Sequence, residues 1–283
     1  MDESIMEANI INNYARLKFR LFILPLFLLA LIVIFLLSLD ALNVDRYIQV
    51  QKDIFFFINH HLGQYPNLQL NLTQFGDGLI LLSFLSIFLL CAPKIWEVLI
   101  PSLLVSVLFS HLLKKIFGVP RPVELLDSSC FIIIGRRVSG FSSLPSGHSI
   151  TIFTVLTVLL FAFMPLKLKY KIAWCFFVIV TGLILAFTRV GVGAHYPIDV
   201  IVGCIIGYIS GLSGIFISRR YKIGHWINSK KCYPFFIILF LIGCGILANK
   251  IIKENLMIFY LSFISLIISL YKIITVYAKN IKR

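Results

Sequence analysis

Long apolar runs separated by short polar segments make up most of the chain. A helix needs about 20 apolar residues to cross the hydrocarbon core of a bilayer. The pattern predicts eight membrane-spanning helices, some of them short, over residues 21–39, 78–93, 96–113, 149–166, 172–188, 199–217, 234–249 and 256–276. We therefore expect an all-α integral membrane protein. No sequence repeat or low-complexity tract points to another architecture.

The composition supports a membrane protein and argues against nucleic acid as a partner. Hydrophobic residues make up 59% of the chain and charged residues only 13%, whereas soluble domains carry roughly 25% charged residues. The formal net charge is +14, but the cations lie mainly in short segments beside the apolar runs. They form no basic stripe with interleaved aromatic residues. This distribution is typical of membrane topology signals and of contact with anionic lipids.

The lysines and arginines near the ends of the runs also predict an orientation. If the N-terminus is cytoplasmic, sixteen of the 26 lie on the inner side and ten on the outer side. The positive-inside rule therefore favours cytoplasmic N- and C-termini. The run at 21–39 is too long for the core of a signal peptide, and no small-residue cleavage site follows it. We expect it to be the first transmembrane helix.

This orientation places two long connections, 40–77 and 114–148, on the outer side. Within the first, an amphipathic stretch at 47–58 is predicted to lie flat on the membrane surface. Arg136 and Arg137 in the second connection suit either a second phosphate or a solvated loop. Asp77 precedes an apolar run and is interpreted as a helix cap.

The sequence indicates no metal, cofactor or disulfide framework. Glu124 and Asp127 are too few and too poorly spaced for a metal site, so we expect neither a metal ion nor a cofactor. No cysteine pair has C-x-x-C spacing. Only one cysteine falls in an outer connection, which leaves it no partner there. The cysteines are Cys91, Cys130, Cys175, Cys204, Cys232 and Cys244.

Three clusters of polar residues lie on the predicted outer face, and the second of them, Pro145-Ser146-Gly147-His148, precedes an apolar run. Ser146 is a natural helix N-cap, and Gly147 lets an anion approach the backbone closely. The free N–H groups of the first helical turn would then point at a phosphate, with His148 beside it. The alternative is an ordinary capped helix with an unrelated histidine.

The third cluster reads Thr188-Arg189, five residues, His195, three residues, Asp199. His195 and Asp199 are one helical turn apart. Asp199 is therefore able to accept a hydrogen bond from one imidazole nitrogen and leave the other as a nucleophile. Arg189 ends the fifth run, where it reaches the same phosphate. The alternative treats Asp199 as a first-turn acid and Arg189 as a flanking residue at the membrane surface.

The first cluster, Lys114, six residues, then Arg121-Pro122, is the weakest by itself, because lysines at a span end often only flank the membrane. The three clusters are more specific together. Lys114, Arg121 and Arg189 supply three positive charges for a dianionic phosphate, and the arginines are able to bind its oxygens bidentately. Phosphoryl transfer depends mainly on such positioning and charge neutralisation.

These motifs resemble those of the type-2 phosphatidic acid phosphatase superfamily, which also includes bacterial acid phosphatases and vanadium haloperoxidases. Its signature is K-x6-R-P, P-S-G-H and S-R-x5-H-x3-D, and this chain departs from it only at Thr188, where serine is usual. The resemblance covers about residues 20–217. It implies a six-helix membrane bundle whose site opens near the outer leaflet. The last two predicted spans lie outside the resemblance.

The resemblance also implies a role for each matching residue. His195 attacks phosphorus and becomes a phosphohistidine, Asp199 orients it, and His148 protonates the leaving group. The residues that hold the phosphate are Lys114, Arg121, Ser146, Gly147 and Arg189. No metal ion takes part in this mechanism.

From these observations we expect a metal-independent membrane phosphatase that hydrolyses a phosphate or diphosphate monoester of a lipid. Candidate substrates are undecaprenyl diphosphate, phosphatidylglycerophosphate, phosphatidic acid and lipid A phosphates. A lipid phosphotransferase with the same intermediate, or a non-catalytic transporter or anionic-lipid binder, is the alternative. The expected location is a bacterial inner membrane with the site on the periplasmic face, although an endoplasmic reticulum membrane also fits.

The expected organisation of the chain has three parts. Residues 1–20 form a polar cytoplasmic tail, and residues 21–217 form the phosphatase core of six transmembrane helices. Residues 218–283 form a basic cytoplasmic loop followed by two additional helices, to which the sequence gives no function. The sequence does not indicate an oligomeric state.

Overall fold

The structure, a computed structural model, describes residues 3–221 and 223–281, and within them it contains helices and loops but no strand. The all-α class predicted from the apolar runs is confirmed. The main helices are α1 (Glu3–Ala15), α2 (Ile23–Ser38), α3 (Val44–Gly63), α4 (Pro66–Thr73), α5 (Gly78–Leu85), α6 (Phe88–Cys91), α7 (Pro93–Phe117), α8 (Pro122–Leu125), α9 (Gly147–Ala162), α10 (Leu168–Gly191), α11 (Pro197–Tyr221), α12 (Tyr233–Glu254) and α13 (Met257–Ile281).

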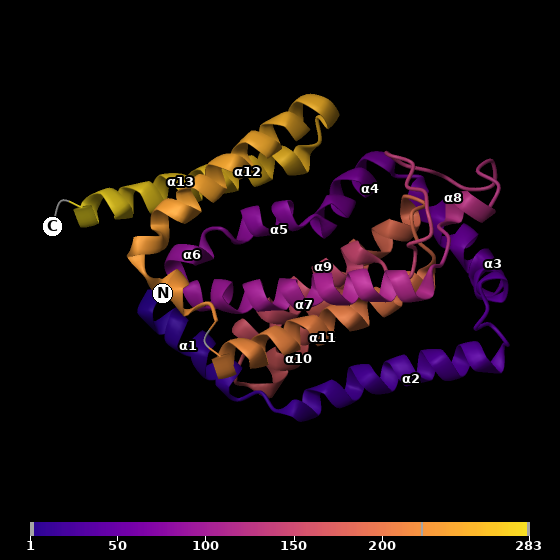
Figure 1. The fold of residues 1–283 in the computed structure, drawn as a ribbon, viewed down its shortest axis with the longest axis horizontal. Helices are drawn as coiled ribbons and strands as arrows, with labels where there is room; N and C mark the ends of the chain where they lie inside the picture. Colours follow the sequence, from indigo (N-terminus) through magenta and orange to yellow (C-terminus); the bar gives the residue numbers. More distant parts are fainter. Residues whose placement is uncertain (1–2, 222, 282–283) are drawn as a thin grey trace.

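Six helical segments of the described chain are long and apolar enough to cross a membrane, judged by length and composition. They are Phe19–Ser38, Pro93–Leu125, Leu168–Gly191, Pro197–Tyr221, Tyr233–Glu254 and Met257–Lys279. The apolar helix α9 is shorter and packs against α7, α10 and α11. Figure 1 shows α2 along one side of this group and the pair of α12 and α13 along the other. The chain is an integral membrane protein.

Helix α11 is the most buried of the six candidate spans, and its glycines let α9 approach closely. A Cβ at Gly203 would lie 2.7 Å from the carbonyl oxygen of Ser146, and one at Gly207 would lie 2.5 Å from that of Ile150. Small residues permit such close contact between membrane helices, where lipid supplies no hydrophobic driving force. The contact holds the start of α9 beside the start of α11.

The prediction of one continuous span over 78–93 is wrong. The chain forms two short helices, α5 and α6, with a turn between them. The Ser86 hydroxyl donates to the Ser83 carbonyl oxygen at 2.6 Å, and serine side chains that bond nearby carbonyls compete with the helical backbone ladder. Ala92 then adopts φ −153° and ψ 63°, because the proline at 93 disfavours the α conformation in the residue before it.

The segment expected to be a polar N-terminal tail contains the docked helix α1. Its Ile10 and Tyr14 are each only 1% exposed and pack in a core cluster with residues of α7 and α9. The Tyr14 hydroxyl donates to the Val158 carbonyl oxygen at 3.1 Å, and the Asn13 amide donates to that of Ala162 at 2.9 Å. Helix α1 therefore closes the end of the bundle at which α9 finishes.

The amphipathic stretch at 47–58 lies within helix α3, which packs against α10 and α11. Tyr47, Gln51, Phe55 and Asn59, spaced four residues apart, form a buried stripe on it. This stripe faces the protein and carries polar groups into it, a contact that the amphipathic pattern alone did not predict.

Helices α12 and α13 pack against each other, and α13 packs against α5. The hydroxyls of Ser86 and Ser269 are hydrogen-bonded at 2.7 Å. Asp77 caps α5 by accepting a hydrogen bond from the Leu79 amide at 2.9 Å, which confirms its interpretation as a cap. It also forms an ion pair with Lys250 at 2.8 Å. Polar contacts therefore attach the C-terminal pair of helices to α5 and to the residues beside it.

Candidate active site

All the residues predicted for the site lie at one end of the bundle. Several of them occupy helix ends, which is where the sequence predicted them. They are Lys114 in the last turn of α7, Arg121 just before α8, Ser146, Gly147 and His148 at the start of α9, Arg189 in the last turn of α10, His195 in the following loop, and Asp199 in the first turn of α11.

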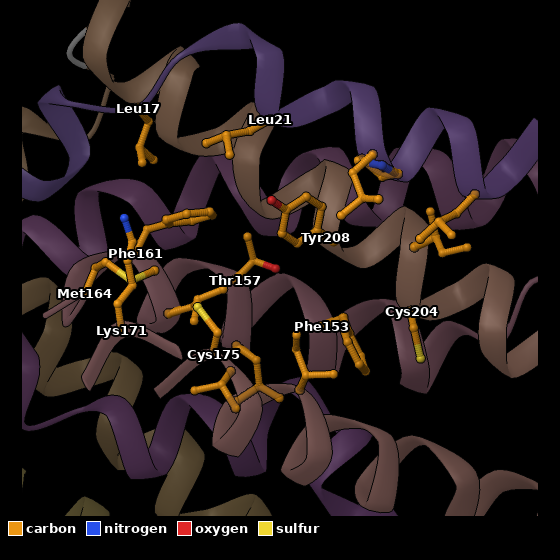
Figure 2. Close-up of a pocket in the computed structure, with 18 of the residues that line it drawn as sticks. Leu17, Leu21, Phe153, Thr157, Phe161, Met164, Lys171, Cys175, Cys204 and Tyr208 are labelled. Atoms are coloured by element: carbon orange, nitrogen blue, oxygen red, sulfur yellow. The ribbon is translucent and has the colours of Figure 1, made fainter. Parts of the chain in front are cut away.

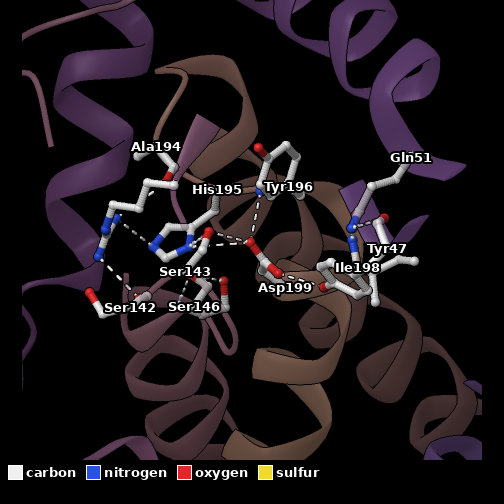
Figure 3. A network of polar contacts seen from close by, with 12 residues as sticks. Tyr47, Gln51, Ser142, Ser143, Ser146, Ala194, His195, Tyr196, Ile198 and Asp199 are labelled. Atoms are coloured by element: carbon white, nitrogen blue, oxygen red, sulfur yellow. Dashed lines mark hydrogen bonds and ion pairs between the residues drawn. The ribbon is translucent and has the colours of Figure 1, made fainter. Parts of the chain in front are cut away.

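His195 and Asp199 form the centre of a buried polar network (Figure 3). The imidazole Nδ1 lies 3.7 Å from Asp199 Oδ2. The Ser143 hydroxyl lies between them, donating to Asp199 Oδ2 at 2.6 Å and lying 3.5 Å from the imidazole Nδ1. The Ser143 hydroxyl therefore links the carboxylate to the imidazole ring.

Asp199 is itself fixed by groups that the sequence motifs do not contain. The Tyr47 hydroxyl of α3 donates to Asp199 Oδ1 at 2.6 Å, and the backbone N–H of Tyr196 donates to Oδ2 at 2.9 Å. The Gln51 side chain, one turn further along α3, accepts from the Ile198 amide at 3.0 Å. Helix α3 therefore holds both the carboxylate and the backbone that carries it.

The second nitrogen of His195 faces a guanidinium group. Arg121 Nη1 lies 3.2 Å from His195 Nε2 and donates to the Ala194 carbonyl oxygen at 3.1 Å. A guanidinium N–H is only a donor, so we infer that Nε2 is the acceptor and that the ring proton is on Nδ1. This tautomer presents a lone pair on Nε2, which is the nitrogen a nucleophilic histidine needs.

The surroundings of His195 also hold its imidazole in the neutral form. Burial lowers its pKa well below the usual 6.5, and the positive charges of Arg121, Arg189 and Lys114 lower it further. Desolvation and nearby like charge both disfavour the imidazolium. The imidazole is therefore uncharged at neutral pH in the free protein.

Both arginines of the site have donors that no protein group satisfies. Arg189 donates from Nη1 to the Thr73 hydroxyl at 2.8 Å. The Nε atoms of Arg121 and Arg189 are buried and have no hydrogen-bond partner in the described chain. Buried polar groups are normally paired, so these two N–H groups are available to an acceptor that the protein does not itself supply.

Helix α9 begins at Gly147, and Ser146 is its N-cap, as predicted. Its hydroxyl accepts from the Ser149 amide at 3.4 Å and the Ser149 hydroxyl at 2.9 Å, while its own amide donates to the Asp199 carbonyl oxygen at 3.0 Å. Ser146 therefore shapes the helix start and links it to α11. The amides of the first turn are free of intrahelical acceptors by the geometry of a helix.

Glycines pack closely against the cationic and imidazole side chains at this helix start. A Cβ at Gly147 would lie 3.2 Å from Lys114 Nζ, and one at Gly76, in the short segment Gln74–Gly76, would lie 2.5 Å from His148 Cγ. A cavity of about 360 Å³ adjoins them. Its lining includes Ser106, Ser110, His111, Lys114, His148 and Thr151. His148 therefore faces a space lined by both polar and apolar residues.

The arginine pair Arg136-Arg137 and the motif residue Thr188 make their contacts outside the cluster around His195. The Arg137 guanidinium contacts the Ser128 hydroxyl at 3.2 Å, and Arg136 is exposed, so no contact in the structure joins this pair to the site. Thr188 donates to the Leu185 carbonyl oxygen at 2.6 Å within α10. Its hydroxyl is thus bonded within α10, directly before Arg189.

Residues 97–223 match the model described as the PAP2 superfamily. This finding confirms the resemblance to the type-2 phosphatidic acid phosphatases that the three motifs predicted. The matched segment begins within α7 and runs past the end of α11, and it therefore contains every residue of the predicted site.

Similarity to individual proteins falls in the same region. The chain is 35% identical over 136 residues to a lipid A 1-phosphatase of Rhizobium etli, covering 46% of this chain and 55% of that protein. It is 38% identical over 116 residues to that of Rhizobium johnstonii, covering 40% and 44%. The chain thus spans about half the length of these two curated relatives.

Two further matches extend over a larger share of the matched protein than the two lipid A 1-phosphatases do. An undecaprenyl-diphosphatase of Sulfolobus acidocaldarius is 24% identical over 190 residues, covering 66% of this chain and 87% of that protein. The crystal structure of Aquifex aeolicus LpxE has a TM-score of 0.48 and 26% identity, covering 59% of this chain and 95% of that one.

Proposed function

We propose that this chain, whose residues 97–223 match the PAP2 superfamily model, is a membrane lipid phosphatase that works through a phosphohistidine at His195. The observation that carries the proposal is the arrangement around that imidazole. Its Nε2 faces Arg121, and the charges of Arg189 and Lys114 lie near enough to lower its pKa; both arginines have buried N–H groups without partners in the described chain. A phosphate placed there supplies both the missing acceptors and the electrophile.

The proposed reaction has two steps. In the first, His195 Nε2 forms a bond to phosphorus while the bond to the leaving oxygen breaks, and His148 gives that oxygen a proton. In the second, His148 takes a proton from water, the water oxygen attacks the phosphohistidine, and the P–N bond breaks to release phosphate. The Asp199 carboxylate keeps the ring proton on Nδ1 throughout.

The cations are proposed to stabilise the charge on the three equatorial oxygens. Lys114, Arg121 and Arg189 approach the site from α7, the α7–α8 loop and α10, and such positioned charges supply most of the catalysis in phosphoryl transfer. The first-turn amides of α9, beginning at Gly147, complete the phosphate site. Ser146 contributes by capping that helix.

The proposed substrate is a lipid phosphate or diphosphate. The relatives act, by their names, on lipid A at its 1-phosphate and on undecaprenyl diphosphate, and these are the two candidates we favour. Phosphate release from each purified lipid, without an added acceptor, tests the proposal. Release only when a second lipid hydroxyl is supplied indicates a phosphotransferase. A transporter is disfavoured because the charges lie at one end of the bundle.

Activity is expected to be independent of metal ions. Within the described residues no group of three or more His, Cys, Asp or Glu side chains is placed to hold a metal, and the three cations perform the neutralising role a metal would have. Full phosphate release is expected in excess chelator without added magnesium. A loss of activity that a divalent ion restores would show that the proposed mechanism is wrong.

The site is expected on the periplasmic side of a bacterial inner membrane, with both termini cytoplasmic. The native Cys130 is a probe for the side of the membrane on which the site lies, because it is exposed in the loop between α8 and α9 that leads to the site. In a variant whose other five cysteines are serine, an impermeant maleimide should label Cys130 in intact cells. Labelling that requires permeabilised cells would reverse the orientation.

Tyr47→Phe is expected to lower kcat about 10- to 100-fold with little change in KM, since a hydrogen bond to a charged group contributes about 1.5–3 kcal/mol. The substitution removes the hydroxyl bound to Asp199 and keeps the ring packed. Tyr196→Phe is the matched control, because its buried hydroxyl has no partner in the described chain. Equal effects in both variants, or a change in KM alone, would remove Tyr47 from the positioning of Asp199.

A further inference from the structure

A second, larger cavity lies away from the candidate active site. It is a groove of about 880 Å³ between α2 on one side and α9, α10 and α11 on the other (Figure 2). Its walls are mostly apolar, and Figure 2 shows Phe153, Phe161, Cys175 and Tyr208 around it. Along α2 it runs from Leu24 to Phe35, about 17 Å at 1.5 Å per residue.

One end of the groove is strongly basic. Four cations line it, contributed by the end of α1, the segment that leads into α2, and the first turn of α10. No aspartate or glutamate lines the groove, and none of the four cations makes an ion pair in the described chain. They are Arg16, Lys18, Arg20 and Lys171, and all are exposed.

This basic end is remote from the phosphate site. Helix α9 begins beside His195 and ends, 16 residues later, next to Met164 in the groove wall, so the two ends are about 24 Å apart. A substrate whose phosphate lies at His195 would therefore place its phosphate at the wrong end of the groove. The basic end of the groove is therefore free for a different anionic group.

We propose that the groove binds one anionic phospholipid from the leaflet at the N-terminal end of α2. In this proposal an acyl chain fills the apolar part of the groove. The groove is long enough for one, because its length along α2 exceeds half of the roughly 30 Å hydrocarbon core. The phosphate contacts the four cations, because basic residues beside a transmembrane helix attract anionic headgroups. The proposal is independent of the catalytic function.

In the test, the protein is equilibrated with vesicles of phosphatidylglycerol and phosphatidylcholine and then purified. Native mass spectrometry identifies the lipid that remains bound. One tightly held phosphatidylglycerol per chain is expected. The combined variant Arg16→Gln, Arg20→Gln and Lys171→Gln should lower its retention at least about tenfold, because three headgroup contacts are lost. The control variant Lys169→Gln, Arg220→Gln and Lys272→Gln removes three exposed cations that do not line the groove and should retain the lipid.

A second variant tests the acyl-chain part with all four cations present. Cys175 is partly buried in the groove wall, so Cys175→Trp should fill the space and release the lipid. Phosphate release from an aryl phosphate, which has no acyl chain, shows that each variant is folded. Equal retention of phosphatidylcholine, equal loss in the control variant, or full retention in Cys175→Trp would each overturn the proposal.

Discussion

Replacing His195 with alanine is expected to abolish turnover of every substrate, because no covalent intermediate is able to form without it. Its Nε2 is the only imidazole nitrogen in the described chain that lies in hydrogen-bonding contact with a site arginine. The loss should be the same for a lipid phosphate and for an aryl phosphate. The measurement is phosphate release from both substrates under saturating conditions.

His148 should respond differently, because it is proposed to protonate the leaving group. General acid catalysis contributes about 10²–10⁴-fold, and it matters most for a poor leaving group such as a lipid alkoxide. Nitrophenolate leaves without a proton, so His148→Ala should retain much more activity on nitrophenyl phosphate than on a lipid. His60→Ala, an exposed histidine of α3, serves as the control. Aryl phosphatase activity in His195→Ala but not in His148→Ala would exchange the two roles.

Replacing Arg121 with alanine is expected to lower kcat/KM about 10²–10³-fold, the usual cost of removing one group that stabilises transition-state charge. Arg121 contacts both His195 Nε2 and the backbone at Ala194, and its Nε is unsatisfied. Arg121→Lys should fall between wild type and alanine, since lysine keeps the charge but loses the planar fork. Vanadate, which mimics the five-coordinate phosphoryl group, should inhibit both variants more weakly.

Arg136→Ala is the matched control for this prediction. Arg136 is exposed and lies in the loop between α8 and α9, so its loss removes a positive charge from the same face without touching the phosphate site. Activity and vanadate inhibition should stay at the wild-type level. Unchanged vanadate inhibition in Arg121→Ala would remove Arg121 from the phosphate site.

The sequence motifs predicted which residues gather at the site because their spacing follows helix ends. Lys114 ends one helix, Ser146 caps another, and Asp199 stands one turn after His195. The glycines of α11, spaced four apart at 203, 207 and 211, were also a readable signal for its contact with α9, and sequence reasoning overlooked them.

Other parts of the site depend on tertiary contacts that no local pattern specifies. Tyr47 lies 152 residues before Asp199 in the chain, yet their side chains are 2.6 Å apart. A helix that mixes tyrosine, glutamine and asparagine with phenylalanine on one face looks like a membrane-surface helix by its amphipathic pattern alone. Only the packing of α3 on α10 and α11 shows that the polar groups of this stripe serve Asp199 and its neighbours.

The break between α5 and α6 has a similar cause. A hydropathy pattern counts apolar residues, and residues 78–91 contain enough of them for most of a span. The turn depends on where the hydroxyls of Ser83 and Ser86 find acceptors, which includes the contact with Ser269 far along the chain. Side-chain hydrogen bonds of this kind are not encoded in the average hydropathy.

The most direct test of the account is to trap the covalent intermediate. Purified protein mixed with ³²P-labelled substrate and quenched within milliseconds should yield a phosphoprotein that is stable in alkali and labile in acid, as phosphohistidine is. Peptide mapping should place the label on His195, and His195→Ala should carry none. A label on another residue, or a fully active enzyme that never becomes labelled, would contradict the nucleophilic role of His195.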